Sequence, residues 1–207
     1  MRAPVLLLTA ALLLSGCSSG SSPQGSEPSP GTSDVAPDPR VLPAGKDDLV
    51  LKAQTYYSPT DFVPPLALTV PEGWHSTHRG DDAFDLSKPD PAKDAPLVAV
   101  VFDTPDGEAV APVLAALKAK AKGAVDVTGT LLGQPATGFE VTGGSGELLS
   151  SPSGTIALDL AAGQRVRVLG TDVDGTPLLV VVLVPDGTRW ATVLPEADAL
   201  LAKVTRG

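Results

Sequence analysis

The sequence changes character near residue 48, and this change limits the fold more than any other feature. Residues 49–207 carry a dense pattern of apolar runs separated by glycine, proline and aspartate. A segment of about 160 residues can bury roughly two thirds of the surface that its unfolded chain exposes, which is enough for one self-sufficient core. The only cysteine, Cys17, lies outside this segment, so no disulfide can tie it together. We therefore expect a single globular domain over 49–207 that depends on its core alone.

Most of the apolar runs in this domain are short, and their composition is typical of β-strands. The run 97–102 is apolar throughout, which is typical of a strand covered on both faces. Two hairpin turns are expected, one around Gly133-Gln134-Pro135 and one at Asp174-Gly175. The other expected strands span residues 66–70, 74–79, 83–87, 125–132, 136–142, 155–160, 165–169 and 178–184.

Two further segments have apolar residues at helical spacing. The first has Val110, Val113, Leu114, Leu117 and Ala121 on one stripe. The second repeats at the same spacing after Thr188, which we expect to cap it, and its Pro195 either kinks the helix or starts a new one. The apolar residues of this second stripe are Trp190, Val193, Leu194, Ala197, Leu200, Leu201 and Val204. The pattern predicts an α+β fold, with a mainly antiparallel sheet covered by two helices.

The amino terminus has the features of an export signal. Arg2 precedes an apolar stretch over 3–14, which is shorter than the roughly 20 residues that a membrane-spanning helix needs. Leu14-Ser15-Gly16-Cys17 follows, and it resembles the bacterial lipobox. The resemblance implies that residues 1–16 are a lipoprotein signal peptide, cleaved before Cys17, and that the Cys17 sulfur receives a diacylglycerol. We expect a cell-membrane lipoprotein, anchored on the extracytoplasmic face; an ordinary secretory signal with a chance cysteine is the alternative.

Residues 17–48 form the expected connection between the anchor and the domain. Serine, glycine and proline dominate this segment, and branched apolar side chains are almost absent before Val41 and Leu42. Such a composition buries too little apolar surface to offset the entropy lost on ordering. We expect a disordered tether.

The charge balance excludes one class of partner. Lysine and arginine number 15, aspartate and glutamate number 24, and the net charge is −9. Nucleic-acid binding depends on a basic surface that attracts phosphates, and no basic patch is evident in this sequence. We expect no nucleic-acid partner.

Several motifs in the domain resemble one known group. The chain resembles exported actinobacterial proteins of unknown function with a PsbP-like domain, a fold named for an extrinsic protein of photosystem II. The resemblance covers roughly residues 56–205 and implies a PsbP-like fold. The photosystem proteins bind a large membrane complex and are not enzymes, and none of their binding residues can be matched here. The segments that carry the resemblance are Phe62-Val63-Pro64-Pro65, Leu68-Thr69-Val70-Pro71-Glu72-Gly73-Trp74, Gly163-Gln164-Arg165-Val166-Arg167, Asp172-Val173-Asp174-Gly175 and Leu194-Pro195-Glu196-Ala197.

The spacing of the two histidines does not favour a shared metal site. His75 and His78 lie three residues apart on an expected strand, where such residues point to opposite faces. Asp81 and Asp82 follow them, and we interpret the whole group as solvated or turn residues. Arg79-Gly80-Asp81 matches the integrin-recognition tripeptide. A motif of only three residues often occurs by chance, so we assign it no function.

Two glycine-containing motifs lack residues that a calcium-binding, phosphate-binding or nucleophile motif requires. Asp172-Val173-Asp174-Gly175 places its glycine too early for a calcium loop, and no glutamate follows at the required position. Gly143-Gly144-Ser145-Gly146 lacks the lysine of a phosphate-binding loop and the frame of a serine nucleophile. We interpret the first as a hairpin turn and the second as a surface loop.

Trp74 and Trp190 are expected in the core. The alternative for Trp74 is contact with a partner through an exposed indole.

No catalytic residue, metal site or cofactor site is predicted, and we expect a protein that is not an enzyme. The leading hypothesis is a noncatalytic binding or scaffolding domain with an envelope protein as partner. One alternative is a carrier of lipid or another apolar ligand, with an internal cavity lined by residues such as Leu97, Val101 and Val180. The other is a hydrolase with an unrecognised site.

Overall fold

The structure, a computed structural model, describes residues 38–43, 49–80, 82–93, 95–105, 109–144, 147–150 and 157–207. All of them belong to one compact unit, Pro37–Gly207. The predicted signal peptide, Cys17 and the lipobox residues Leu14, Ser15 and Gly16 lie outside the described residues. None of the helices in the described part of the chain has the length and hydropathy of a membrane span.

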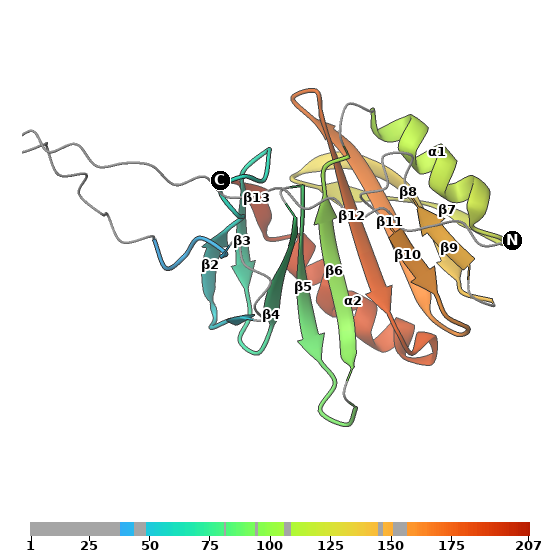
Figure 1. Ribbon diagram of the computed structural model, residues 1–207, viewed down its shortest axis with the longest axis horizontal. Coiled ribbons are helices and arrows are strands. Elements are labelled where there is room, and N and C mark those ends of the chain that lie inside the picture. The colour runs from blue at the N-terminus through green and yellow to red at the C-terminus, as the bar shows by residue number, and fades with distance from the viewer. Residues whose placement is uncertain are drawn as a thin grey trace, which may run out of the picture. The chain divides into compact units, whose positions relative to one another are not determined.

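A central eight-stranded sheet forms the body of the unit (Figure 1). Every neighbouring pair in it is antiparallel, which confirms the predicted sheet type. In spatial order the strands are β1 (Leu49–Val50), β4 (His75–Gly80), β5 (Ala83–Pro89), β6 (Pro96–Asp103), β12 (Thr176–Val184), β11 (Arg165–Val173), β8 (Gln134–Thr142) and β7 (Val125–Leu131).

The two helices pack on opposite faces of this sheet. α1 (Val110–Lys120) contacts β11 and β12, while α2 (Trp190–Leu201) contacts β6, β12 and β3 (Figure 1). The sheet therefore divides two apolar cores, which we call the α2 core and the α1 core. The sheet is also more extensive than the expected sheet covered by two helices, since its outer strands extend past both of them.

Strand β6 contributes side chains to both cores. Val98, Val100 and Phe102 lie in the α2 core, whereas Val101 lies in the α1 core. Successive strand residues point to opposite faces, so an uninterrupted apolar run is what a doubly covered strand needs. The interpretation of residues 97–102 is confirmed.

Two small sheets complete the unit. β13 (Val204–Arg206), β3 (Leu66–Val70) and β2 (Gln54–Tyr57) form one, and β9 (Glu147–Ser150) with β10 (Ala157–Leu160) forms the other. Val204 was expected to end the second helix, and this was wrong. The helix stops at Leu201, and Val204 pairs with Leu68 in β13. The sequence could not distinguish the two, because a valine that packs on an apolar core is compatible with a helix or with a strand.

The helix ends differ partly from expectation. All five stripe residues of the first helix are buried, as predicted. Pro195 lies inside α2 without ending it. The cap role of Thr188 was wrong: Asp186 caps a short 3₁₀ turn, η1 (Gly187–Arg189), and its Oδ1 accepts from the Thr188 backbone N–H at 3.2 Å. The Thr188 hydroxyl donates to the same Asp186 oxygen at 2.6 Å, and α2 begins without a side-chain cap.

The hairpin turns need two consecutive residues with positive φ. Asp174 and Gly175 have φ of 53° and 83°, which confirms that turn. The other turn uses Leu132 and Gly133, with φ of 53° and 74°, so the expected position around Gly133-Gln134-Pro135 was shifted. β8 instead begins at Gln134, paired with Leu131.

The folded unit also starts earlier than residue 49. Leu42 is 1% exposed, and its backbone N–H donates to the Tyr57 carbonyl at 2.9 Å. The Tyr57 N–H donates in turn to the Arg40 carbonyl at 2.8 Å. The expected tether over 17–48 is therefore corrected, because residues 38–43 pack on β2.

Candidate binding groove

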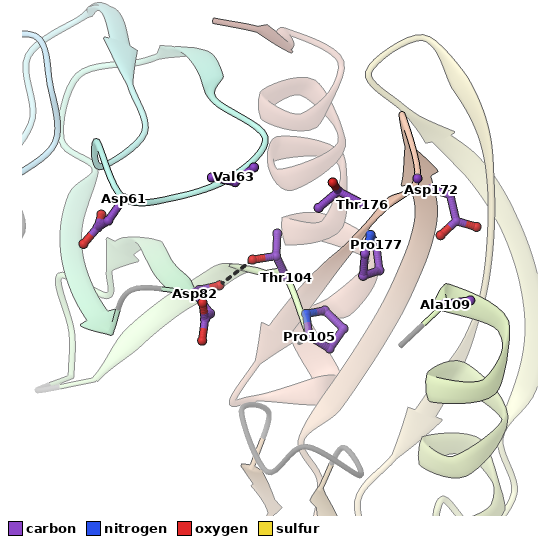
Figure 2. Close-up of a pocket in the computed structure, with 10 residues that line it drawn as sticks. Asp61, Val63, Asp82, Thr104, Pro105, Ala109, Asp172, Thr176 and Pro177 are labelled. Atoms are coloured by element: carbon purple, nitrogen blue, oxygen red, sulfur yellow. Dashed lines mark hydrogen bonds between the residues drawn. The ribbon is translucent and has the colours of Figure 1, made fainter. Parts of the chain in front are cut away.

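A groove of about 810 Å³ opens where several strands of the central sheet end (Figure 2). Loops and strand ends far apart in the sequence meet here, because β5, β6, β12 and β11 are consecutive neighbours in the sheet. The residues that line the groove are Asp61, Val63, Asp82, Thr104, Pro105, Ala109, Asp172, Gly175, Thr176 and Pro177.

One wall of the groove joins the turn after β4 to the end of β6. The Thr104 backbone N–H donates to the Asp82 carbonyl at 3.0 Å, and the Thr104 hydroxyl donates to the same oxygen at 3.4 Å (Figure 2). Asp103 precedes this threonine and pairs with Ala83 in the strand ladder. The position of Asp82 is thus set by the backbone of the sheet.

The opposite wall is built on β11 and the start of α1. The first turn of α1 has no acidic residue, and Ala109 provides no side-chain cap. Instead, the Val110 backbone N–H donates a hydrogen bond to Oδ1 of Asp172 on β11, at 3.5 Å. A carboxylate suits this place, because the first N–H groups of a helix lack partners within the helix and carry partial positive charge.

An exposed apolar residue lies at the edge of the groove. Phe62 is 2% exposed and packs edge-on against Phe84, with ring centroids 4.9 Å apart, which fixes the loop after β2. The next residue, Val63, is 58% exposed. The loop therefore leaves the Val63 side chain exposed at the edge of a groove that Asp61 also lines.

The groove combines negative charge with a small apolar surface. Figure 2 shows Asp61 and Asp82 on one side of the groove and Asp172 on the other. The described lining residues include three aspartates and no lysine, arginine, histidine or cysteine. Its described chemistry is that of carboxylates, threonine hydroxyls and apolar carbons, a combination that attracts a cationic group with an aliphatic stem.

The tryptophans are both in the α2 core. Trp190 is 5% exposed, as expected, and the Arg165 and Arg167 guanidinium groups lie 4.7 and 5.9 Å from its ring centroid. Trp74 is 2% exposed. The core interpretation of Trp74 is thus confirmed, and the partner-contact alternative is not supported, since almost none of the side chain is accessible.

Of the described residues of the histidine segment, one lines the groove. His75 and His78 both lie on β4, paired with Ser87 and Phe84, and neither lines the groove. Asp82 does, while Asp81 lies outside the described residues. Among the residues that the structure describes, no cluster of three or more histidine, cysteine, aspartate or glutamate side chains is arranged to hold a metal ion.

Two other sequence expectations concern packing. Gly143 joins the ends of β8 and β11, since its N–H donates to the Gln164 carbonyl at 2.8 Å, while Ser145 and Gly146 lie outside the described residues. Val101 and Val180 belong to different cores on opposite faces of the sheet. They cannot line one cavity, so that detail of the carrier hypothesis was wrong.

The groove was not predicted from the sequence. Asp61 and Asp82 lie between strands, and Asp172 lies one residue before the end of β11, so the sequence could indicate that each carboxylate is near a strand end. What the sequence does not show is the strand order, which brings the turn after β4 beside the hairpin between β11 and β12.

Comparison with known proteins finds no matching family model and no matching curated protein. Among solved structures, the chain is similar to cyanobacterial PsbP (CyanoP) from Synechocystis sp. PCC 6803, with 13% identity, a TM-score of 0.44, and coverage of 76% of this chain and 95% of that one. It is also similar to a protein from Bacteroides thetaiotaomicron, with 12% identity and a TM-score of 0.42. The match covers 79% of this chain but only 49% of the Bacteroides chain. Similarity this weak carries no information on activity, ligand or partner.

Proposed function

We propose that this protein is a noncatalytic binding lipoprotein of the cell envelope, whose groove holds a cationic segment of an envelope partner. The observation that supports the proposal is the groove lining, with Asp61, Asp82 and Asp172 around a hollow of about 810 Å³. A lysine or arginine could place its charge between these carboxylates and its aliphatic stem against Val63 and Pro105. Arginine and lysine side chains commonly bury their stems in this way.

The proposal includes a lipid on Cys17 as the membrane anchor. With a net charge of −9 the chain gains nothing from anionic headgroups, so acyl chains would supply the membrane affinity. Residues 18–37, rich in serine, glycine and proline, would then separate the folded unit from the membrane. This arrangement would leave the groove accessible to a neighbouring protein.

The alternatives receive less support from the same residues. A carrier needs an enclosed apolar chamber, whereas the apolar side chains of β6 and β12 fill two separate cores. A hydrolase needs a nucleophile beside a base. The described groove lining has the hydroxyls of Thr104 and Thr176, without a histidine or lysine beside them.

Site-specific photocrosslinking in cells that make the full chain tests this proposal. A photoreactive residue at position 63 samples the groove, and one at position 50 is the matched control, because Val50 is 63% exposed and lies outside the groove. We expect one recurrent envelope protein, identified by mass spectrometry, to be joined to position 63 and not to position 50. Equal labelling from both positions, or none from position 63, would contradict the groove as the binding site.

Charge variants test the chemistry of recognition. Asp61→Asn with Asp82→Asn should lower the yield of the position-63 adduct about three- to tenfold, because each carboxylate that contacts water contributes roughly 0.3–0.7 kcal/mol to such a pair. Asp159→Asn with Glu72→Gln removes the same charge at exposed positions outside the groove and should leave the yield unchanged. If both pairs lower the yield equally, net charge rather than the groove would explain binding.

A further inference from the structure

Strand β7 forms one edge of the central sheet and is long for an edge strand. It spans Val125–Leu131, and within the described part of the chain its only strand neighbour is β8. The opposite edge strand, β1, has two residues. An edge strand presents a row of backbone N–H and C=O groups that can pair with another strand.

The usual protections of an edge are absent from β7. Its sequence, Val-Asp-Val-Thr-Gly-Thr-Leu, contains no proline and no lysine, and its pairing with β8 continues without a bulge. Its one charged residue, Asp126, is paired within the chain, with Lys118 Nζ 2.6 Å from Oδ1. Val125 is 65% exposed, so the strand also begins with an uncovered apolar side chain.

The hairpin geometry shows which backbone groups face outward. Leu131 and Gln134 flank a two-residue turn, and such a pair exchanges both of its hydrogen bonds. The pattern alternates along the strand, so the N–H and C=O groups of Asp126, Thr128 and Thr130 point away from β8. These are the groups that a new strand would meet.

The sequence of β7 suits a second copy of itself. In an antiparallel pair, Thr128 can lie opposite Thr128, Asp126 opposite Thr130, and Val125 opposite Leu131. All seven residues then pair and every outward backbone group finds a partner, whereas a shift by two residues loses pairs at both ends. A parallel arrangement would instead bring the two Asp126 carboxylates close together, and like charges across strands are unfavourable.

The same register would cover the exposed valine. Val125 and Leu131 lie on the α2 face of the sheet, where a groove of about 430 Å³ beside β7 is lined in part by Leu132, Leu201 and Ala202. With Val125 opposite Leu131 of the other copy, its side chain would lie at the entrance to that copy's groove.

We propose that β7 pairs with β7 of a second copy of this chain, antiparallel and centred on Thr128, so that two central sheets join into one. Two copies held on one membrane by the proposed lipid would meet at a high effective concentration, which favours even a short strand interface, and this support rests on the proposed anchor. This inference does not depend on what the acidic groove binds.

Cysteine crosslinking of the full chain in its own membrane tests the proposal. Across a hydrogen-bonded antiparallel pair the Cα atoms lie about 5.5 Å apart, which is within the range of a disulfide. Thr128→Cys should therefore give a disulfide-linked dimer on mild oxidation. Thr137→Cys is the matched control: Thr137 is an exposed threonine directly opposite Thr128, but one strand further in, on β8.

The unsubstituted chain shows whether Cys17 contributes any crosslink. Absence of a dimer with Thr128→Cys, or equal dimer formation with Thr137→Cys, would overturn the proposal. A second variant adds Thr130→Pro to Thr128→Cys. Proline there removes an outward N–H that β8 does not use, so the crosslink should be lost while the circular dichroism spectrum and unfolding midpoint are retained. Retention of the crosslink in this folded variant would also contradict the proposed pairing.

Discussion

Asp38 and Arg40 attach the beginning of the folded unit to the rest of it. The Arg40 guanidinium bonds the Asp38 carboxylate at 2.8 Å and lies over the Tyr57 ring, 5.3 Å from its centroid. The Arg40 backbone N–H also donates to Asp38 Oδ1 at 2.9 Å. Since Leu42 enters the α2 core two residues later, these contacts lie where the chain enters the folded unit.

The pKa of the Asp38 carboxyl provides a direct test of this arrangement. Hydrogen bonds from Arg40, first from its side chain and then from its backbone, lower the pKa of Asp38 to about 2. A depressed pKa means that the ion pair adds stability above about pH 4 and loses it as the pH falls toward 2. NMR titration should show this low value, and Arg40→Gln should raise the pKa toward the ordinary range. An ordinary Asp38 pKa in the unsubstituted chain would contradict the contact.

Single-residue roles differed in how well the sequence predicted them. The burial of Trp190 and Leu117 followed from helical spacing, because a regular stripe can face only one core. The capping role of Asp186 and the positive φ of Leu132 did not follow, since each depends on where an element ends to within one residue.

Helix α1 depends on one small residue in the strand beneath it. A Cβ atom on Gly170 of β11 would lie 2.6 Å from Val110 Cγ1 and 2.7 Å from Leu179 Cδ2. Both neighbours belong to the α1 core, one on the helix and one on β12. Glycine here allows the first turn of the helix to approach the sheet closely.

Adding one methyl group should therefore move the helix or its neighbours. Gly170→Ala is expected to lower the free energy of unfolding by about 1–3 kcal/mol, the usual cost of overpacking. Gly144→Ala is the control, because a Cβ there meets nothing within 4 Å. Urea denaturation of both variants measures the difference, and equal stability would show that α1 does not need this close contact.

Among the elements, the long ones were predictable and the short ones were not. The strands β3, β6 and β12 and both helices have apolar patterns long enough to identify from the sequence. β1, β2 and β13 have two to four residues and acquire their structure from the strands beside them. The groove depends on sheet order, which is a consequence of long-range pairing. The positions of Asp61 and Asp82 between strands do not show that the two residues line one groove.

The whole molecule combines an expected anchor with two candidate contact surfaces on one folded unit. The acidic groove lies at the ends of β6, β11 and β12, and the open edge lies along β7, at the end of the sheet order. Anchoring would matter to both proposals, because it confines the unit to a surface where envelope proteins and further copies are concentrated. The lipid on Cys17 is therefore the central claim.

Mass spectrometry of the mature protein purified from membranes tests that claim most directly. We predict that the first residue is Cys17 and that its amino-terminal peptide carries the added mass of a diacylglycerol. An amino terminus at another residue, or an unmodified Cys17, would contradict the anchor.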